Sequence, residues 1–159
     1  MSTLANTSRI TPFLWFDSNA EEAANFYVSI FPNSRLVGEL LNNIEDPNMV
    51  PKGKPLTVSF ELDGLRFTAL NGGPQFKFNE AISFVVRCSS QDEIDNYWSK
   101  LTAGGGAEVQ CGWLKDKFGL SWQIVPANLP ELLKHPKAMQ ALMGMKKLDI
   151  AELERAGQS

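Results

Sequence analysis

Apolar residues along the chain form short runs typical of strands, separated by stretches with helical spacing. The first run, Ile10 to Phe16, is rich in aromatic residues and ends at Asp-Ser-Asn, which predicts a buried strand leading into a helix. Asn19 and Glu22 have the spacing of a capping box, and the apolar stripe behind them predicts a helix that ends before Pro32. The chain is therefore expected to begin with a strand and a capped helix.

A hairpin signal follows this helix. Leu56 to Leu62 and Leu65 to Leu70 flank the dipeptide Asp63-Gly64, which is typical of a tight hairpin turn. One more strand, Leu36 to Leu41, precedes them across a polar loop that contains proline. The order in the first half of the chain is therefore βαβββ.

The same order repeats in the second half. Moving the chain by 71 residues places Phe13 on Phe84 and Glu22 on Glu93, so that strand, capped helix and aromatic pair coincide. The pattern predicts a strand from Ala81 to Arg87, a helix capped by Ser90, and short strands at Glu108 to Cys111, Trp113 to Lys115 and Leu120 to Val125.

One βαβββ half could not bury both its helix and its sheet face. We therefore expect an α+β fold in which two modules, residues 9–73 and 80–126, form one pseudo-symmetric domain over residues 9–155. Residues 128–155 show short apolar stripes interrupted at Pro136 and near Asp149, which predicts a helical tail that packs on the modules or in a dimer.

Composition and charge narrow the possible partners. With 43% apolar and 21% charged residues, the 159-residue chain is typical of a globular protein, and no apolar run is long enough to cross a bilayer. Its net charge of -3 argues against nucleic acid or anionic membrane as a partner. We expect a cytoplasmic location, because the N-terminal residues lack the pattern of a secretory signal.

Histidine and cysteine are too few for the common metal motifs. The single histidine, His135, lies in the tail and excludes sites that need two or three imidazoles. Cys88 and Cys111 match no redox or zinc spacing and are expected to be reduced thiols.

Three runs resemble a known family: Ile10 to Tyr27, Leu70 to Cys88 and Cys111 to Pro126. They are similar to the PhnB-like family, often labelled 3-demethylubiquinone-9 3-methyltransferase, of the vicinal oxygen chelate superfamily. That superfamily also includes glyoxalase I, extradiol dioxygenases and fosfomycin or bleomycin resistance proteins. The resemblance implies paired βαβββ modules whose mixed sheets curl around a cleft, and a homodimer.

Metal-dependent members of this superfamily place His or Glu ligands on strand positions that face the cleft. The resemblance puts these positions near Pro12 and Ser83, around Leu70 and Asn71, and at Gln123, where glutamine replaces the usual carboxylate. A two-residue shift keeps the same face and gives the alternatives Ile10, Leu14, Ala81 and Val85. Because Pro, Ser, Asn and Gln are poor ligands for hard or borderline cations, we predict that no metal is bound.

The remaining chemistry favours binding of a small molecule. The many aromatic residues predict an apolar cleft with a few neutral polar groups, which suits a planar organic ligand. The candidate ligand-binding residues are Phe13, Trp15, Asn71, Ser83, Trp113 and Gln123. Each has a structural alternative: the aromatic residues as core, Asn71 as a turn residue, Ser83 as a packing residue and Gln123 as a partner of the backbone.

Three classes of function stay open, and no catalytic residue is assigned. The first is a binding or resistance-type protein without a metal. The second is an enzyme of the same fold, either a methyltransferase as the family label says or a glyoxalase-type lyase or isomerase. The third is a structural partner with no ligand. Binding of S-adenosylmethionine has no support in the sequence, because the glycine run Gly104 to Gly106 follows a helix instead of preceding one.

Overall fold

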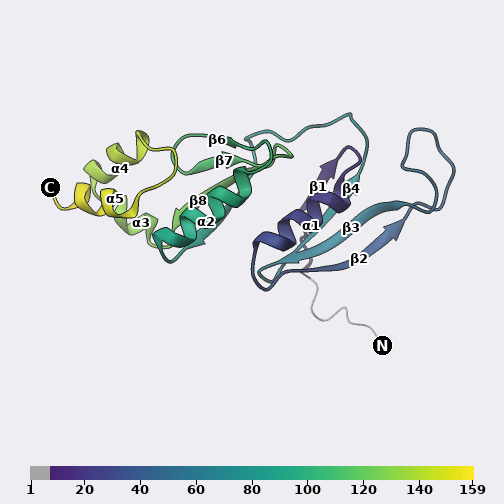
Figure 1. Ribbon diagram of the computed structural model, residues 1–159, viewed down its shortest axis with the longest axis horizontal. Helices are drawn as coiled ribbons and strands as arrows, with labels where there is room; N and C mark the ends of the chain where they lie inside the picture. The colour runs from purple at the N-terminus through teal and green to yellow at the C-terminus, as the bar shows by residue number, and fades with distance from the viewer. Residues whose placement is uncertain (1–7) are drawn as a thin grey trace. The chain divides into compact units, whose positions relative to one another are not determined.

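The computed structural model describes residues 8–159, which form two compact units that meet in sequence between Lys77 and Phe78. Figure 1 shows each unit as a sheet with a helix on one face. The first unit contains β1 (Phe13–Phe16), α1 (Ala20–Ile30), β2 (Arg35–Leu41), β3 (Pro55–Leu62) and β4 (Leu65–Asn71). The second contains β5 (Ser83–Cys88), α2 (Gln91–Thr102), β6 (Ala107–Glu108), β7 (Trp113–Lys115), β8 (Ser121–Pro126), α3 (Leu129–Leu132), α4 (Pro136–Met143) and α5 (Ile150–Gly157). The predicted α+β fold with two βαβββ units is confirmed.

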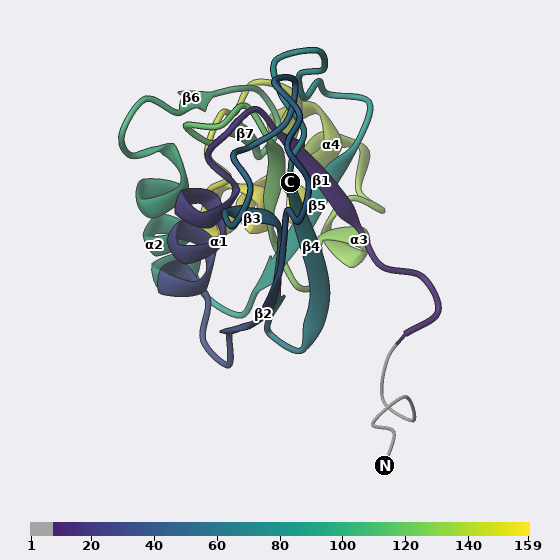
Figure 2. The same ribbon diagram turned by 90° about the vertical axis from the view of Figure 1, so that its right-hand side faces the viewer.

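The sheet of the first unit has the strand order β1-β4-β3-β2. β1 runs parallel to β4, beside which it lies in Figure 2, whereas the other neighbours are antiparallel. The turn Asp63-Gly64 has positive φ at both residues, so the predicted hairpin is confirmed. Under α1, Tyr27 stacks on Phe60, and Phe60 stacks on Phe67. These rings form the centre of the unit's core.

The sheet of the second unit repeats this plan with the order β5-β8-β7-β6. β5 is parallel to β8, and α2 buries Ile94, Trp98 and Leu101. The strand expected at Glu108 to Cys111 is shorter, because Cys111 has a positive φ and donates its N–H to the carbonyl of Met145 in the tail.

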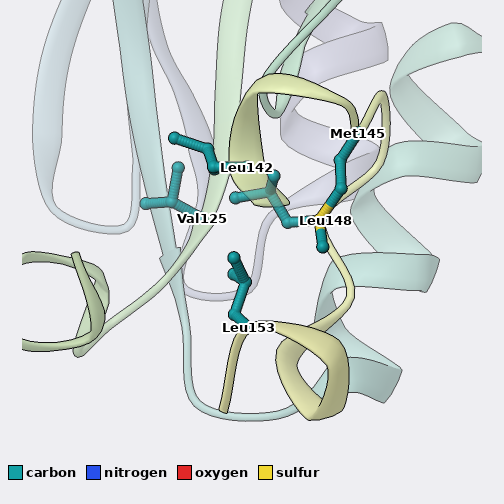
Figure 3. Packing of buried hydrophobic residues seen from close by; sticks show 5 residues of the cluster. All are labelled: Val125, Leu142, Met145, Leu148 and Leu153. Atoms are coloured by element: carbon teal, nitrogen blue, oxygen red, sulfur yellow. The ribbon is translucent and has the colours of Figure 1, made fainter. Parts of the chain in front are cut away.

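The helical tail belongs to the second unit and has a small core of its own. Figure 3 shows this core, the tail cluster, in which side chains of the tail meet the end of β8. Its buried members are Val125, Leu142, Met145, Leu148 and Leu153. Gln91 at the start of α2 ties the tail down by donating to the carbonyl of Leu148 and accepting from the N–H of Ile150.

The two expected capping boxes have different outcomes. In α2, Ser90 Oγ accepts from the N–H of Glu93, which confirms the prediction for the N-cap. In α1 the prediction is wrong, because Asn19 makes no capping hydrogen bond with its side chain. The N–H of Ala20 is instead bound by Asn71, 51 residues further along the chain.

Within residues 8–159, no helix combines the length and the apolar content that a membrane span requires. That the two units form one domain around a shared cleft stays a prediction.

Candidate functional site

Each sheet has one face covered by a helix and one face that the helix leaves uncovered, and we call the second the open face. In β1, Leu14 and Phe16 are buried beneath α1, so the alternation of the strand places Phe13 and Trp15 on the open face of the first unit. Phe13 is 58% exposed. Both residues were predicted to bind ligand, and they share one surface.

The strand register arranges this open face in three rows. The first row contains Arg35, Glu61 and Arg66, the second Gly38, Ser59, Thr68 and Phe13, and the third Leu40, Thr57, Leu70 and Trp15. The rows change from charged through hydroxyl-bearing to mostly apolar. The face therefore has a polarity gradient along its strands.

Trp15 is held firmly on this face. Its indole Nε1 donates to the carbonyl of Gly73 at 2.9 Å, and Phe76 packs edge-on against the ring at 4.9 Å between centroids. Gly72 passes so close that an added Cβ would lie 2.5 Å from Trp15 Cε2. The segment after β4 thus fixes the orientation of the indole.

The charged row contains a shared carboxylate. Glu61 accepts from Arg35 Nε and from Arg66 Nη2, each at 3.1 Å. The hydrogen bond from Arg66, followed by the one from Arg35, lowers the pKa of Glu61 below its ordinary value. Two guanidinium groups therefore share one carboxylate and leave one positive charge uncompensated in this row.

Asn71 lies on the helix-covered side of the sheet and not on the open face. It is 4% exposed, its Oδ1 accepts from the N–H of Ala20, and its Nδ2 donates to Glu21 Oε1 and to the carbonyl of Pro55. Its amide is thus engaged in holding the start of α1 against β3 and β4, a structural role that differs from the turn residue considered in the sequence analysis. Asn71 also borders a half-open cavity of about 290 Å³, which is otherwise lined by Asp17, Ser18, Pro47, Asn48, Met49, Val50, Pro51, Gly73 and Pro74.

The other predicted residues meet on the open face of the second unit. Gln123 Nε2 donates to Ser83 Oγ at 2.9 Å, and the register places Trp113 and Val85 on either side of Gln123. Ser83, Trp113 and Gln123 are all half-buried, and Val85 is exposed. Sequence reasoning from two distant segments therefore identified one local group of side chains.

This group does not fit the metal that the fold family implies. Ser83 and Gln123 are neutral and hydrogen-bonded to each other, so neither offers the charged oxygen or imidazole that the cation would need. In the part of the chain that the structure describes, no three His, Cys, Asp or Glu side chains cluster in a way that could hold a metal ion.

Two neighbouring features complete this surface. Lys115 forms an ion pair with Glu80, and its hydrogen bond lowers the pKa of Glu80 below the ordinary value. Ser121, which pairs with Ser83 in the register, is buried, and its hydroxyl has no hydrogen-bond partner. The ion pair ties the segment before β5 to the end of β7.

Asp116 is a structural residue in the turn between β7 and β8. It is 2% exposed, and its carboxylate accepts from the N–H groups of Phe118 and Leu120 and from the indole of Trp122. The sequence signal for this turn is the glycine three residues after Asp116, since Gly119 turns the chain back with φ 89°.

The thiols and the histidine lie outside the candidate groups. Burial, helped by the charge of Glu93, raises the pKa of Cys88 to about 12, so it is a neutral thiol. Cys111 is half-buried beside the tail cluster, and His135 is exposed just before α4. The tail position predicted for His135 is confirmed.

Two βαβββ units with these sheet orders define the class of vicinal oxygen chelate folds, which includes glyoxalases and bleomycin resistance proteins. The sequence profile described as 3-demethylubiquinone-9 3-methyltransferase matches residues 8–125. The chain belongs to this PhnB-like family.

Solved structures agree with this assignment. The PhnB protein from Bacillus cereus is 34% identical, has a TM-score of 0.65, and is matched over 74% of this chain and 99% of its own. Protein PA1353 from Pseudomonas aeruginosa is 19% identical with a TM-score of 0.60, over 76% of this chain and 98% of its own. The fosfomycin resistance protein FosX from Listeria monocytogenes is 16% identical with a TM-score of 0.54, over 79% and 97%. The last two show the fold alone, and no curated protein matches the chain.

Proposed function

We propose that the protein binds a small planar organic molecule without a metal ion, through residues of its open faces. The main support for this proposal is the hydrogen bond between Gln123 and Ser83. It joins two neutral side chains at positions where the superfamily's metal-dependent members have ligands. FosX from Listeria monocytogenes, which shares the fold, has been solved in complex with Mn(II).

The residue types on the open faces support an aromatic ligand. In the first unit, Phe13 is exposed and Trp15 is held in a fixed orientation, so both offer flat surfaces at low entropic cost. In the second unit, Trp113 lies beside Gln123, whose amide can donate and accept hydrogen bonds. Neutral amide and hydroxyl groups next to indole rings suit carbonyl or hydroxyl substituents on a planar ring.

Methyl transfer has less support, although the family name assigns it to relatives of this chain. Gly104 to Gly106 follows α2 and leads into the antiparallel strand β6, where positive φ at Gly104 and Gly105 ends the helix. A glycine turn that held S-adenosylmethionine would stand between a parallel strand and the next helix. Calorimetry with S-adenosylmethionine tests this alternative, and micromolar binding would support it.

Metal content is the first test of the proposal. We expect elemental analysis of the purified protein to find no stoichiometric transition metal, also after incubation with Mn²⁺, Ni²⁺ or Zn²⁺. The double variant Ser83→His with Gln123→Glu restores ligand types that such cations accept and should bind Ni²⁺ more tightly than the native protein. One tightly bound metal per native chain would overturn the metal-free proposal.

Ligand binding is the second test. A thermal-shift screen of aromatic metabolites, quinone precursors and antibiotics identifies probes, and fluorescence titration measures their affinity. We expect Trp113→Ala and Gln123→Ala to weaken a bound probe, and Gln140→Ala on the exposed face of α4 to leave it unchanged. A probe that binds all three variants equally would refute the proposed surface.

We further propose a cytoplasmic homodimer. Phe13 and Leu40 on the first unit and Ile82 and Val85 on the second are between 42% and 66% exposed, and contact with a second copy of the chain would remove this apolar surface from water. Light scattering coupled to size exclusion measures the mass directly, and a monomer at micromolar concentration would contradict this proposal.

A further inference from the structure

We propose that Arg66, on the open face of the first unit, binds a carboxylate of the planar ligand, so that the ligand class is an aromatic acid. This inference rests on the proposed function and adds the charge of the ligand to it. It concerns the charged row of Arg35, Glu61 and Arg66, for which no role was predicted from the sequence.

The charge of this row is unbalanced in favour of an anion. Glu61 is the carboxylate partner of both guanidinium groups, and the row therefore has a net charge of +1. Arg66 is better placed than Arg35 to act on a ligand, because its side chain is 30% exposed and that of Arg35 is 66% exposed. A partly buried guanidinium interacts more strongly with an anion than a fully hydrated one does.

Arg66 also has an unused donor in a buried position. Its Nη2 binds Glu61, but its Nε is buried and has no hydrogen-bond partner in the structure. A buried N–H without a partner is unfavourable, and charged groups in proteins are normally paired. Because this nitrogen is covered, an incoming carboxylate would act on the accessible part of the Arg66 guanidinium and share its positive charge.

The neighbouring rows suit the ring of an aromatic acid. Successive rows lie about 7 Å apart, because each is two residues further along the strands. Thr68 and Phe13 occupy the row next to Arg66, and Trp15 and Leu70 lie one row beyond. Above Gly38 in the middle row, no atom lies within 4 Å of where a Cβ would be. With its carboxylate at Arg66, a bicyclic ring would extend to the second row, where Thr68 and Phe13 lie.

Paired probes test the charge separately from the ring. The acid is 2-naphthoate and its neutral counterpart is 2-naphthamide, which has the same ring and nearly the same shape. We expect the native protein to bind the acid about tenfold or more tightly than the amide, as a charge-assisted hydrogen bond would provide. The preference should fall as salt is added.

Three variants test the residues. Arg66→Gln should abolish the preference and leave the affinity for 2-naphthamide unchanged, while Arg66→Lys should retain part of the preference. Glu61→Gln should strengthen binding of the acid, because both guanidinium groups lose their competing carboxylate. Arg155→Gln on α5 makes the same change of charge at an exposed position and should have no effect.

The outcomes separate this inference from the proposed function. Equal binding of acid and amide to the native protein overturns the inference and leaves the binding of planar molecules standing. Binding of neither probe, together with no hit among the screened aromatic compounds, overturns both. A preference for the acid that persists in Arg66→Gln refutes the role of Arg66. If that variant does not fold, Arg66→Lys and Glu61→Gln decide by the same comparison.

Discussion

Trp122 Nε1 donates a hydrogen bond of 2.9 Å to Asp116 Oδ2, and both side chains are almost completely buried. The other carboxylate oxygen of Asp116 accepts from two backbone N–H groups of the turn between β7 and β8. One carboxylate therefore fixes both the turn and the indole that packs beneath α2.

We expect Asp116→Asn to destabilise the protein by about 1–3 kcal/mol. The NH₂ group of the asparagine would face either the indole N–H of Trp122 or the backbone N–H groups of the turn, and those buried donors would lose their acceptor. Chemical denaturation followed by tryptophan fluorescence measures the loss. The matched control is Asp63→Asn in the hairpin turn, where Asn-Gly suits positive φ as well as Asp-Gly does. Equal stability of both variants would show that the buried carboxylate contributes nothing.

Gly72 limits the space around Trp15. We expect Gly72→Ala to cost about 1–3 kcal/mol and to displace the indole from the carbonyl of Gly73, because the added Cβ would overlap the ring. Urea denaturation reports the cost, and a red shift of tryptophan emission reports the displacement. Gly38→Ala is the control, since open space surrounds that position. A variant at Gly72 with native stability and emission would contradict this account.

Cys88 should be unreactive in the folded protein. Its pKa of about 12 means that almost no thiolate exists near pH 9, and the thiolate is the reactive form. In a Cys111→Ser background, iodoacetamide should label Cys88 only after unfolding in guanidinium chloride. The thiol of Cys88 loses its proton at a higher pH in the folded chain than in the unfolded chain. The free energy of unfolding should therefore be unaffected by this group below about pH 9 and should decrease above it. Rapid labelling under native conditions would refute the raised pKa.

The tail cluster should contribute to the stability of the second unit. Leu148 and Leu153 are fully buried in it (Figure 3), so Leu153→Ala should cost about 2–5 kcal/mol. Thermal and urea denaturation measure the effect, with Met143→Ala at a 65% exposed position of α4 as the control. A small loss for Leu153→Ala would mean that the tail packs loosely on the end of β8.

The sequence predicted the architecture well because its signals were local. These signals are the period of apolar residues, the Asp63-Gly64 turn and the capping residue Ser90, each of which acts over a few residues. The same order of elements occurs in both halves of the chain. For Ser83 and Gln123, strand alternation and family resemblance both point to the open face on which they lie. For the first strand the resemblance indicated Pro12, Ile10 or Leu14, whereas the structure buries Leu14 beneath α1 and leaves Phe13 and Trp15 on the open face.

Contacts between distant segments could not be predicted from the sequence. Nothing near Asn71 in the sequence indicates that it binds the start of α1, and the shared carboxylate of Glu61 depends on the pairing of three strands. The buried role of Asp116 was not found from the sequence, because the lysines on either side of it are typical of a surface turn. Long-range hydrogen bonds carry no local pattern from which they could be read.

Because Asn71 binds the start of α1, we expect the two helices to form at different stages of folding. α2 carries its own cap in Ser90 and can begin as soon as its residues exist, whereas the first N–H of α1 gains its partner only when β4 arrives from 51 residues away. The amide proton of Ala20 is therefore a reporter for the docking of β4. During refolding, hydrogen exchange at Ala20 should slow together with the strand amides of β4, and later than the amides of α2.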